Sequence, residues 1–207
     1  NSSNLNFYNQ YKSNIHRGEY PWSIKATEAY EEARWEVHDF IGAHNPFEIV
    51  FTNNCTTALN LVVKILTDNY LQEGDKILLT EMDHHSMIVP WSIARQHKNL
   101  KLEFVNLKED GSLDEKDFKN KVKGCKVVNL TETSNVLGCN IPIKKLTKMA
   151  KQAGALTVVD GCQAVPHKVL NVKDAPIDFY CFSGHKLGSL FGVGVLYINC
   201  ALETLFK

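Results

Sequence analysis

Short apolar runs alternate with amphipathic helical runs along most of this chain, and this alternation restricts the possible folds more than any other feature. The expected strands are residues 48–51, 76–79, 102–105, 127–130, 156–159, 179–182 and 193–198. The expected helices are residues 56–66, 88–96, 113–122 and 143–153. Strands that alternate with helices over short connections predict an α/β fold, in which helices cover both faces of a parallel or mixed sheet.

The composition supports one large globular domain and excludes several other classes of protein. The chain has 207 residues, of which 44% are hydrophobic and 22% charged, and these are ordinary globular values. Residues 1–20 are expected to form an N-terminal arm, and residues 21–207 the large domain. Because the formal net charge is zero, we expect no nucleic-acid partner. No apolar run approaches the roughly 20 residues of a membrane-spanning helix, so we expect no membrane partner.

The chain has six cysteines, and their spacing matches neither a CxxC pair nor a zinc site. We therefore expect no metal site. Cys125, Cys181 and Cys200 lie in apolar runs and are expected to be buried free thiols, and Cys162 is likewise expected to be a core residue.

Polar residues gather directly after the expected strands. They occupy segments 52–57, 81–85, 131–138, 160–163 and 183–186. In open α/β sheets, ligands bind in the crevice outside the carboxyl ends of the strands. The candidate functional residues should therefore meet at one edge of the sheet.

Lys186 and Asp160 are the residues in these segments with the most distinctive chemistry. A partly desolvated lysine at a strand end can form an imine, although the local sequence alone favours a surface lysine. Asp160 ends an apolar strand and can pair with a metal, a ribose or a protonated ring nitrogen, or can simply cap a turn.

Two further segments are candidates for holding a phosphorylated, aromatic ligand. Thr56 and Thr57 begin a helix, where backbone N–H groups and the helix dipole bind phosphate; plain N-capping is the alternative. His84 and His85 follow a strand, but adjacent histidines rarely ligate one ion. An imidazole stacked on a cofactor ring is the better functional hypothesis for His84.

Together these segments resemble one family, the group II cysteine desulfurases and selenocysteine lyases. These are pyridoxal-phosphate (PLP) enzymes of fold type I within the class V aminotransferase group. The matching segments, in order, are NIHRGEYPWSIKATEAYE (14–31), FTNNCTTALNLV (51–62), LLTEMDHHSMIVPW (78–91), TSNVLGCNIPI (133–143), VVDGCQAVPH (158–167) and DFYCFSGHKLGSLFGVGVLY (178–197). Each motif alone is weak, but the shared order and spacing cover nearly the whole chain.

The resemblance implies a three-layer αβα large domain with a mainly parallel sheet, and it implies a role for each candidate residue. Lys186 would form the Schiff base with PLP, and Asp160 would pair with the pyridine nitrogen. Gln163 would hydrogen-bond the phenolic oxygen, His84 would stack on the ring, and Asn135 would reach the cofactor or the substrate carboxylate. The implied phosphate ligands are Thr56, Thr57, Ser183 and His185. His16 and Arg17, from the arm, would lie near the pocket and the substrate.

The implied reaction releases sulfur from L-cysteine for iron–sulfur cluster assembly. The amine of cysteine would displace Lys186 from PLP, and the freed Lys186 would then remove the Cα proton. An enzyme cysteine would take the sulfur as a persulfide and leave alanine. In the family that cysteine lies in a small C-terminal domain, beyond Lys207, and none of the six cysteines here matches it. We therefore expect an incomplete large domain that binds PLP but does not complete desulfuration alone.

Several alternatives stay open on the sequence. L-selenocysteine is the alternative substrate, and another class V aminotransferase or lyase reaction would use the same lysine and aspartate. An inactive homologue that serves as a scaffold is the third reading. The chain departs from the family pattern at Met87, at Glu132 and at residues 188–191. By resemblance we expect a homodimer and a sulfur-acceptor protein, in the cytoplasm or in a plastid or mitochondrion.

Overall fold

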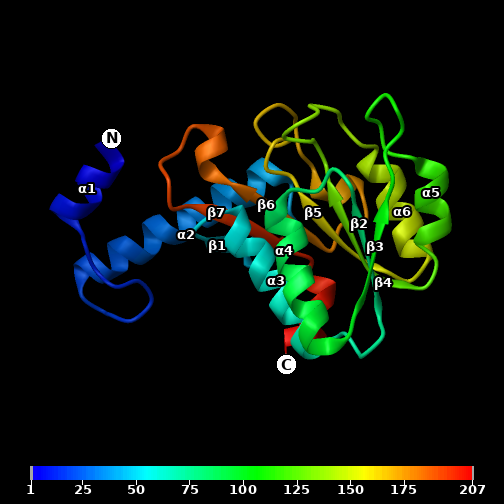
Figure 1. The fold of residues 1–207 in the computed structure, drawn as a ribbon. Coiled ribbons are helices and arrows are strands. Elements are labelled where there is room, and N and C mark those ends of the chain that lie inside the picture. The colour runs from blue at the N-terminus through cyan, green and yellow to red at the C-terminus, as the bar shows by residue number, and fades with distance from the viewer. Residues whose placement is uncertain (1, 207) are drawn as a thin grey trace.

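A seven-stranded sheet forms the middle layer of the computed structural model, which describes residues 2–206 (Figure 1). The strands are β1 (Ile49–Thr52), β2 (Lys76–Thr80), β3 (Lys101–Val105), β4 (Cys125–Thr131), β5 (Leu156–Asp160), β6 (Phe179–Ser183) and β7 (Gly194–Ile198). Their order across the sheet is β1-β7-β6-β5-β4-β2-β3. Strand β7 is antiparallel to both of its neighbours, and the pairs from β6 to β3 are parallel. The sheet is therefore mixed and mostly parallel.

Helices cover both faces of this sheet. The helices of the described residues are α1 (Ser2–Gln10), which lies away from the sheet, α2 (Pro21–Ile41), α3 (Cys55–Asn69), α4 (His85–Lys98), α5 (Glu115–Lys121) and α6 (Ile143–Gln152), with short 3-10 helices η1 (Pro46–Glu48), η2 (Val172–Asp174), η3 (Gly184–Leu187) and η4 (Cys200–Phe206). Alternate residues of a strand point to opposite faces. Ile77 and Leu79 of β2 accordingly pack in one core with α3 and α4, and Leu78 packs in the other with α5, α6 and the end of α2. None of the described helices is long and apolar enough to cross a membrane.

The expected α/β fold is confirmed, and each expected strand and helix is present within a few residues of its expected bounds. Helices α1 and α2 were not predicted. Helix α2 buries only Ser23, Ala26 and Ile41, whereas Trp22 and Trp35 are exposed. Because α2 has no apolar stripe that faces this core, its sequence lacks the helical recurrence of apolar residues from which a helix is predicted.

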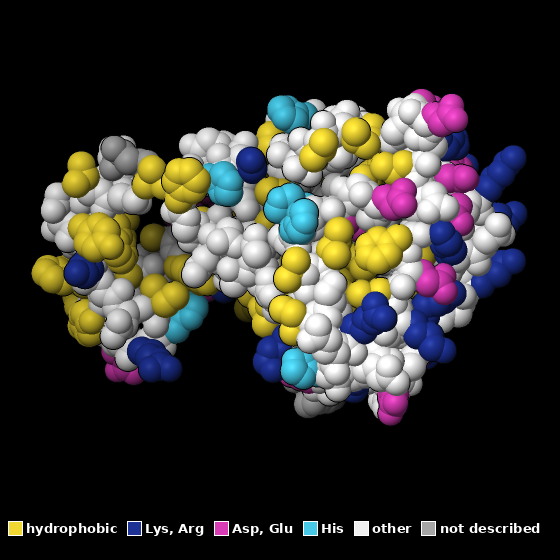
Figure 2. Space-filling model, viewed as in Figure 1, with side chains coloured by type: hydrophobic (Ala, Val, Ile, Leu, Met, Phe, Trp, Pro, Cys, Tyr) yellow, Lys and Arg dark blue, Asp and Glu magenta, His cyan; other side chains and the backbone are white. Residues whose placement is uncertain are grey.

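The N-terminal residues lie apart from the three layers. Helix α1 has no buried residue, and Figure 1 shows it projecting beyond the start of α2. Figure 2 shows hydrophobic side chains gathered on this projecting part. Leu5, Tyr8 and Trp22 are each more than half exposed. This apolar surface has no partner among the described residues.

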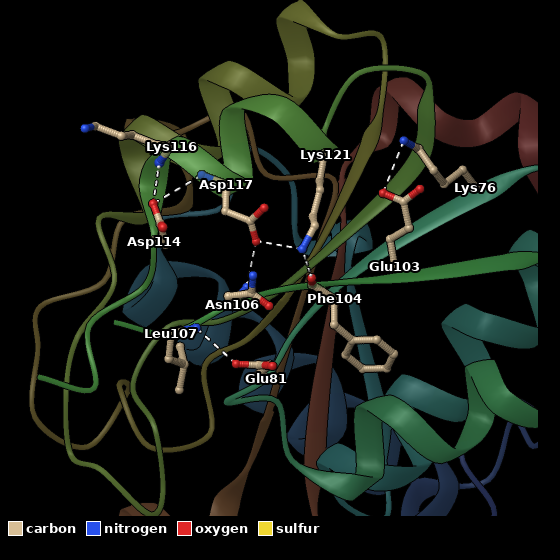
Figure 3. A network of polar contacts seen from close by, with 10 residues as sticks. All are labelled: Lys76, Glu81, Glu103, Phe104, Asn106, Leu107, Asp114, Lys116, Asp117 and Lys121. Carbon is tan, nitrogen blue, oxygen red and sulfur yellow. Dashed lines mark hydrogen bonds and ion pairs between the residues drawn. The ribbon is translucent and has the colours of Figure 1, made fainter. Parts of the chain in front are cut away.

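A polar network fixes α5 and the loop after edge strand β3 (Figure 3). Asp114 caps α5 by accepting the backbone N–H groups of Lys116 and Asp117. The Asp117 carboxylate accepts Lys121 Nζ at 2.7 Å, and Lys121 also donates to the Phe104 carbonyl. The following loop is joined to the end of β2, because Glu81 accepts the backbone N–H of Leu107 at 3.0 Å. The segment that leads to His84 is thus anchored from the sheet edge.

Asn129 is a fully buried polar residue in the centre of β4. Its side-chain oxygen accepts the indole N–H of Trp91 at 2.9 Å, and its amide donates to the carbonyl of Leu78 at 3.1 Å. The pair joins α4 to the sheet inside an otherwise apolar core.

We predict that Trp91→Phe lowers the free energy of unfolding by about 2 kcal/mol, because it leaves the Asn129 oxygen without a donor in the core. In a chain of this size such a loss lowers Tm by about 5 °C. The matched control is Phe47→Leu, since Phe47 is 81% exposed. Urea unfolding of both variants checks the prediction, and equal stabilities would contradict it.

Candidate active site

A cavity of about 220 Å³ lies at the carboxyl ends of the central strands, against the start of α3. It is lined by Cys55, Thr56, His84, Ser86, Thr131, Thr133, Asn135, Asp160, Cys162, Gln163, Ser183, His185 and Lys186. These residues come from five separate stretches of the chain. A polar cavity therefore lies at the edge of the sheet where the sequence pattern predicted ligand binding.

The structure brings most of the candidate residues into this cavity and leaves three outside it. Those that line it are Thr56, His84, Asn135, Asp160, Gln163, Ser183, His185 and Lys186. Thr57 is not a lining residue, because its backbone N–H and its hydroxyl both donate to the Asn54 side chain in the cap of α3. His16 and Arg17 are not lining residues either. His16 instead pairs with Glu31 of α2 at 2.9 Å.

Asp160 lies at the floor of the cavity, at the end of the fully buried strand β5. It is only 5% exposed, and burial raises the pKa of its carboxyl group. Hydrogen bonds to Oδ1 from the Cys162 backbone N–H (2.9 Å) and from Cys55 Sγ (3.5 Å), together with the charge of His84, oppose this rise. Oδ2 has no hydrogen-bond donor among the described residues, so this oxygen is available to a ligand.

Lys186 reaches the cavity from η3, directly after the buried strand β6. The turn is tight, because a Cβ on Gly184 would lie 2.5 Å from the Ser189 hydroxyl. The Lys186 side chain is exposed, and its amine makes no hydrogen bond or ion pair with any described residue. The amine is therefore free to react with a ligand in the cavity.

The start of α3 provides a set of hydrogen-bond donors beside Lys186. Asn54 caps the helix, and the Cys55 backbone N–H donates to the Ser183 hydroxyl at 2.8 Å. The backbone N–H of Thr56 has no acceptor among the described residues. With the Thr56 hydroxyl and the helix dipole, it forms an end of the cavity suited to an anion.

His84 enters the cavity from the opposite side, as the N-cap of α4. Its Nδ1 accepts the backbone N–H of Ser86 at 3.1 Å. The preceding residue, Asp83, is buried and accepts the Thr80 backbone N–H and the Thr131 hydroxyl, each at 2.7 Å. Burial raises the pKa of Asp83 to about 6. The buried carboxyl group thus fixes the turn that presents His84.

The departures from the family pattern at Glu132 and Met87 lie outside the cavity lining. Glu132 accepts the hydroxyl of buried Tyr180 at 2.7 Å and pairs with Lys168 at 3.2 Å. Tyr180 packs so closely under the turn after β5 that a Cβ on Gly161 would lie 1.9 Å from its hydroxyl oxygen. Met87 is fully buried in the core under α4. The remaining departure, residues 188–191, is an exposed loop beside Lys186.

The expectation from the sequence is partly wrong for the cysteines. Cys125 and Cys181 are buried as expected, but Cys200 is exposed because it lies beyond the end of β7. Cys162 packs against the core as expected but is only partly buried, and it lines the cavity together with Cys55. The spacing of these two residues along the chain gave no signal of their proximity.

Cys55 and Cys162 form a coupled thiol pair beside Asp160. The neighbouring Cys55 side chain lowers the pKa of the Cys162 thiol to about 7. The neighbouring Cys162 side chain, together with burial, raises the pKa of Cys55 well above its usual value. Cys162 is therefore the thiol of the pair that is partly ionised near neutral pH.

Comparisons with known proteins agree with this architecture. The family model "Aminotransferase class-V" matches residues 2–207. A probable cysteine desulfurase of Pyrococcus abyssi is 44% identical over 203 residues, which are 97% of this chain and 50% of that protein. A probable cysteine desulfurase of Synechocystis is 41% identical over 93% of this chain and 46% of that protein.

Solved structures show the same relationship. The apo structure of cysteine desulfurase from Thermococcus onnurineus NA1 superposes with a TM-score of 0.94 at 41% identity, covering 99% of this chain and 51% of that chain. A cysteine desulfurase from Escherichia coli superposes with a TM-score of 0.88 at 30% identity, covering 99% and 51%. The chain thus spans about half the length of the relatives it matches. Since the family model covers almost every residue and the fold agrees, the chain belongs to the aminotransferase class-V family.

Proposed function

We propose that the protein is a PLP-dependent cysteine desulfurase and that the cavity at the strand ends is its active site. The observation that carries this proposal is the meeting of the Lys186 amine, the buried Asp160 carboxyl and the start of α3 in one cavity. Relatives named as cysteine desulfurases support the choice of reaction within the family.

The residues present fit this cofactor. Oδ2 of Asp160 is free to accept an N–H, and a cation beside this buried acid would offset the desolvation that raises its pKa. The Thr56 backbone N–H, with the Ser183 and His185 side chains, suits a phosphate at the start of α3. Lys186 lies in the same cavity with an unpaired amine for covalent attachment.

When bound, PLP supplies an electron sink for the negative charge that develops at the substrate Cα. Asp160 would keep the proton on the ring nitrogen, which strengthens that sink. His84 would cover one face of the ring, and Gln163 would donate a hydrogen bond to its phenolic oxygen. Lys186 Nζ would take the proton from Cα, as a general base held at the strand end.

The substrate side of the cavity is more exposed. We propose that Asn135 orients the carboxylate of L-cysteine. A thiolate would attack the substrate sulfur and take it as a persulfide, and protonation of the remaining carbon skeleton would give alanine. We assign that thiolate to none of the six cysteines of this chain. By the resemblance, the sulfur would pass to an acceptor for iron–sulfur cluster assembly.

A homodimer is part of the proposal. The outer surface of α2 exposes Trp22, Ile24, Trp35 and Phe40, each by 46–59%, which is unusual for a monomer surface. Pairing of two copies through this surface would cover these side chains. In the family, a pocket also uses residues of the neighbouring subunit. His16 and Arg17, which do not line the cavity of their own chain, would then serve the substrate in the partner's cavity.

We predict that in the full-length protein Lys186→Ala abolishes covalent attachment of PLP and lowers desulfurase activity at least about 100-fold, the range expected for loss of a general base. The measurements are alanine formation and mass spectrometry of peptides after borohydride reduction. Lys64→Ala, on an exposed part of α3, is the matched control. A reduced adduct on another lysine would contradict the assignment, and no adduct at all would favour an inactive scaffold.

We also predict that iodoacetamide alkylates Cys162 with a rate that rises through a midpoint near pH 7, because the thiolate is the reactive form. PLP should slow this reaction by filling the cavity that Cys162 lines. Cys200 provides an internal control: it is more exposed, but a hydrogen bond with Glu48 raises its pKa. Peptide mass spectrometry across the pH range distinguishes the two. Faster alkylation of Cys200 than of Cys162 at pH 7 would disprove the prediction.

A further inference from the structure

We propose that Cys55, Cys162 and Asp160 form a three-ligand site for a thiophilic divalent cation such as Zn²⁺ at the floor of the cavity. Their ligand atoms, two sulfurs and one carboxylate oxygen, all lie within 4.8 Å of one another. The spacing of cysteines along the sequence indicated no metal site, because these donors come from distant segments. They meet only where the start of α3 packs against the end of β5.

The separation of the donor atoms suits a tetrahedral ion. Zinc bonds of about 2.0–2.3 Å place neighbouring oxygen and sulfur ligands about 3.5 Å apart. Cys55 Sγ and Asp160 Oδ1 are 3.5 Å apart before any ion is present. This pair therefore already has the spacing of two zinc ligands, and the Cys162 sulfur lies within 4.8 Å of both.

The backbone holds each ligand in place. The N–H of Cys55 donates to the Ser183 hydroxyl at 2.8 Å, and the N–H of Cys162 donates to Asp160 Oδ1 at 2.9 Å. Cys55 and Asp160 are buried, whereas Cys162 is partly open to the cavity. The cavity thus leaves room for water as a fourth ligand, as in zinc sites with an open position.

The ligand set selects the kind of ion. Two thiolates favour Zn²⁺ or Cd²⁺ over Mg²⁺ and Ca²⁺, which prefer oxygen ligands. Binding follows M²⁺ + 2 RSH + RCOO⁻ → M(SR)₂(OOCR)⁻ + 2 H⁺, with no change in oxidation state. Because up to two protons leave, the affinity for the cation should rise with pH. Lys186 lines the same cavity and places a positive charge near the resulting anionic complex.

The cation and the cofactor should exclude one another, and this expectation rests on the proposed function. PLP would use Oδ2 of Asp160 and the cation would lie beside Oδ1, so both depend on the one negative charge of this carboxylate. A divalent cation would neutralise that charge and repel a protonated ring nitrogen at the same group. A thiophilic cation would therefore bind the protein before PLP is loaded and would slow that loading.

The test is a titration of the full-length protein, depleted of cofactor and kept reduced, with Cd²⁺. Ultraviolet absorption from thiolate–Cd²⁺ bonds and equilibrium dialysis give the affinity and the stoichiometry. We expect the wild-type protein to give a thiolate–Cd²⁺ signal. Cys162→Ala and Cys162→Ser should each lower the affinity for Cd²⁺ at least about 100-fold, because one of the three protein ligands is lost. Cys200→Ala removes an exposed thiol remote from the cavity and should leave the signal unchanged. No signal, or an equal signal in the Cys162 variants, would overturn the site.

Competition is measured separately, by adding PLP to the Cd²⁺-loaded protein and following the released ion with an indicator dye. Release of Cd²⁺ in step with PLP binding supports mutual exclusion of the two ligands, and simultaneous binding of both overturns it. If the cation-free protein binds no PLP, the proposed function fails, while the titration of the Cys162 variants still decides the cation site.

Discussion

The buried carboxyl group of Asp160 is the constraint around which the site is organised. It lies at the end of a fully buried strand, where an ionised acid is costly unless donors and a cation offset the loss of water. Hydrogen bonds from Cys55 and Cys162 supply part of that compensation. The remaining oxygen faces a cavity that also holds Lys186 and His84. A ligand with a protonated nitrogen beside this oxygen would supply the rest of that compensation.

Other buried polar groups keep the walls of this cavity in position. Asp83 joins the turn after β2 to Thr131 of β4, and Asn129 joins α4 to the same strand through Trp91. Glu132 accepts the Tyr180 hydroxyl beneath the turn after β5. Each of these contacts crosses between strands or layers. The floor of the cavity is consequently fixed by the core, and not by the flanking loops.

The upper part of the site differs from this floor. Asn135, Lys186 and residues 188–191 are exposed, and none of residues 2–20 lines the cavity beside them. The arm instead lies beyond α2 with its apolar side chains uncovered (Figures 1 and 2). A second copy of the chain, placed against α2, would account for both features. The structure thus combines a cavity floor that is held by the core with an upper side that is open to solvent.

Much of the fold and the cofactor-facing side of the site could be predicted from the sequence. The periods of apolar residues located the strands and the core helices, and the rule on strand ends gathered Asp160, Lys186 and Thr56 at one edge. Helix α2 escaped prediction because its apolar residues are exposed in this chain. The placement of Thr57 outside the cavity depended on a single hydrogen-bonded cap at Asn54, which the motif does not reveal.

The sequence by itself determined the seven strands, the four helices α3 to α6 and the residues that follow each strand, because these depend on local periodicity. Only the tertiary structure decided which distant side chains touch. It brought Cys55 and Cys162 to Asp160, buried Met87 in the core and turned Glu132 toward Tyr180. The physical reason is that contacts between layers depend on strand order and on close packing. Neither is encoded in the spacing of residues along the chain.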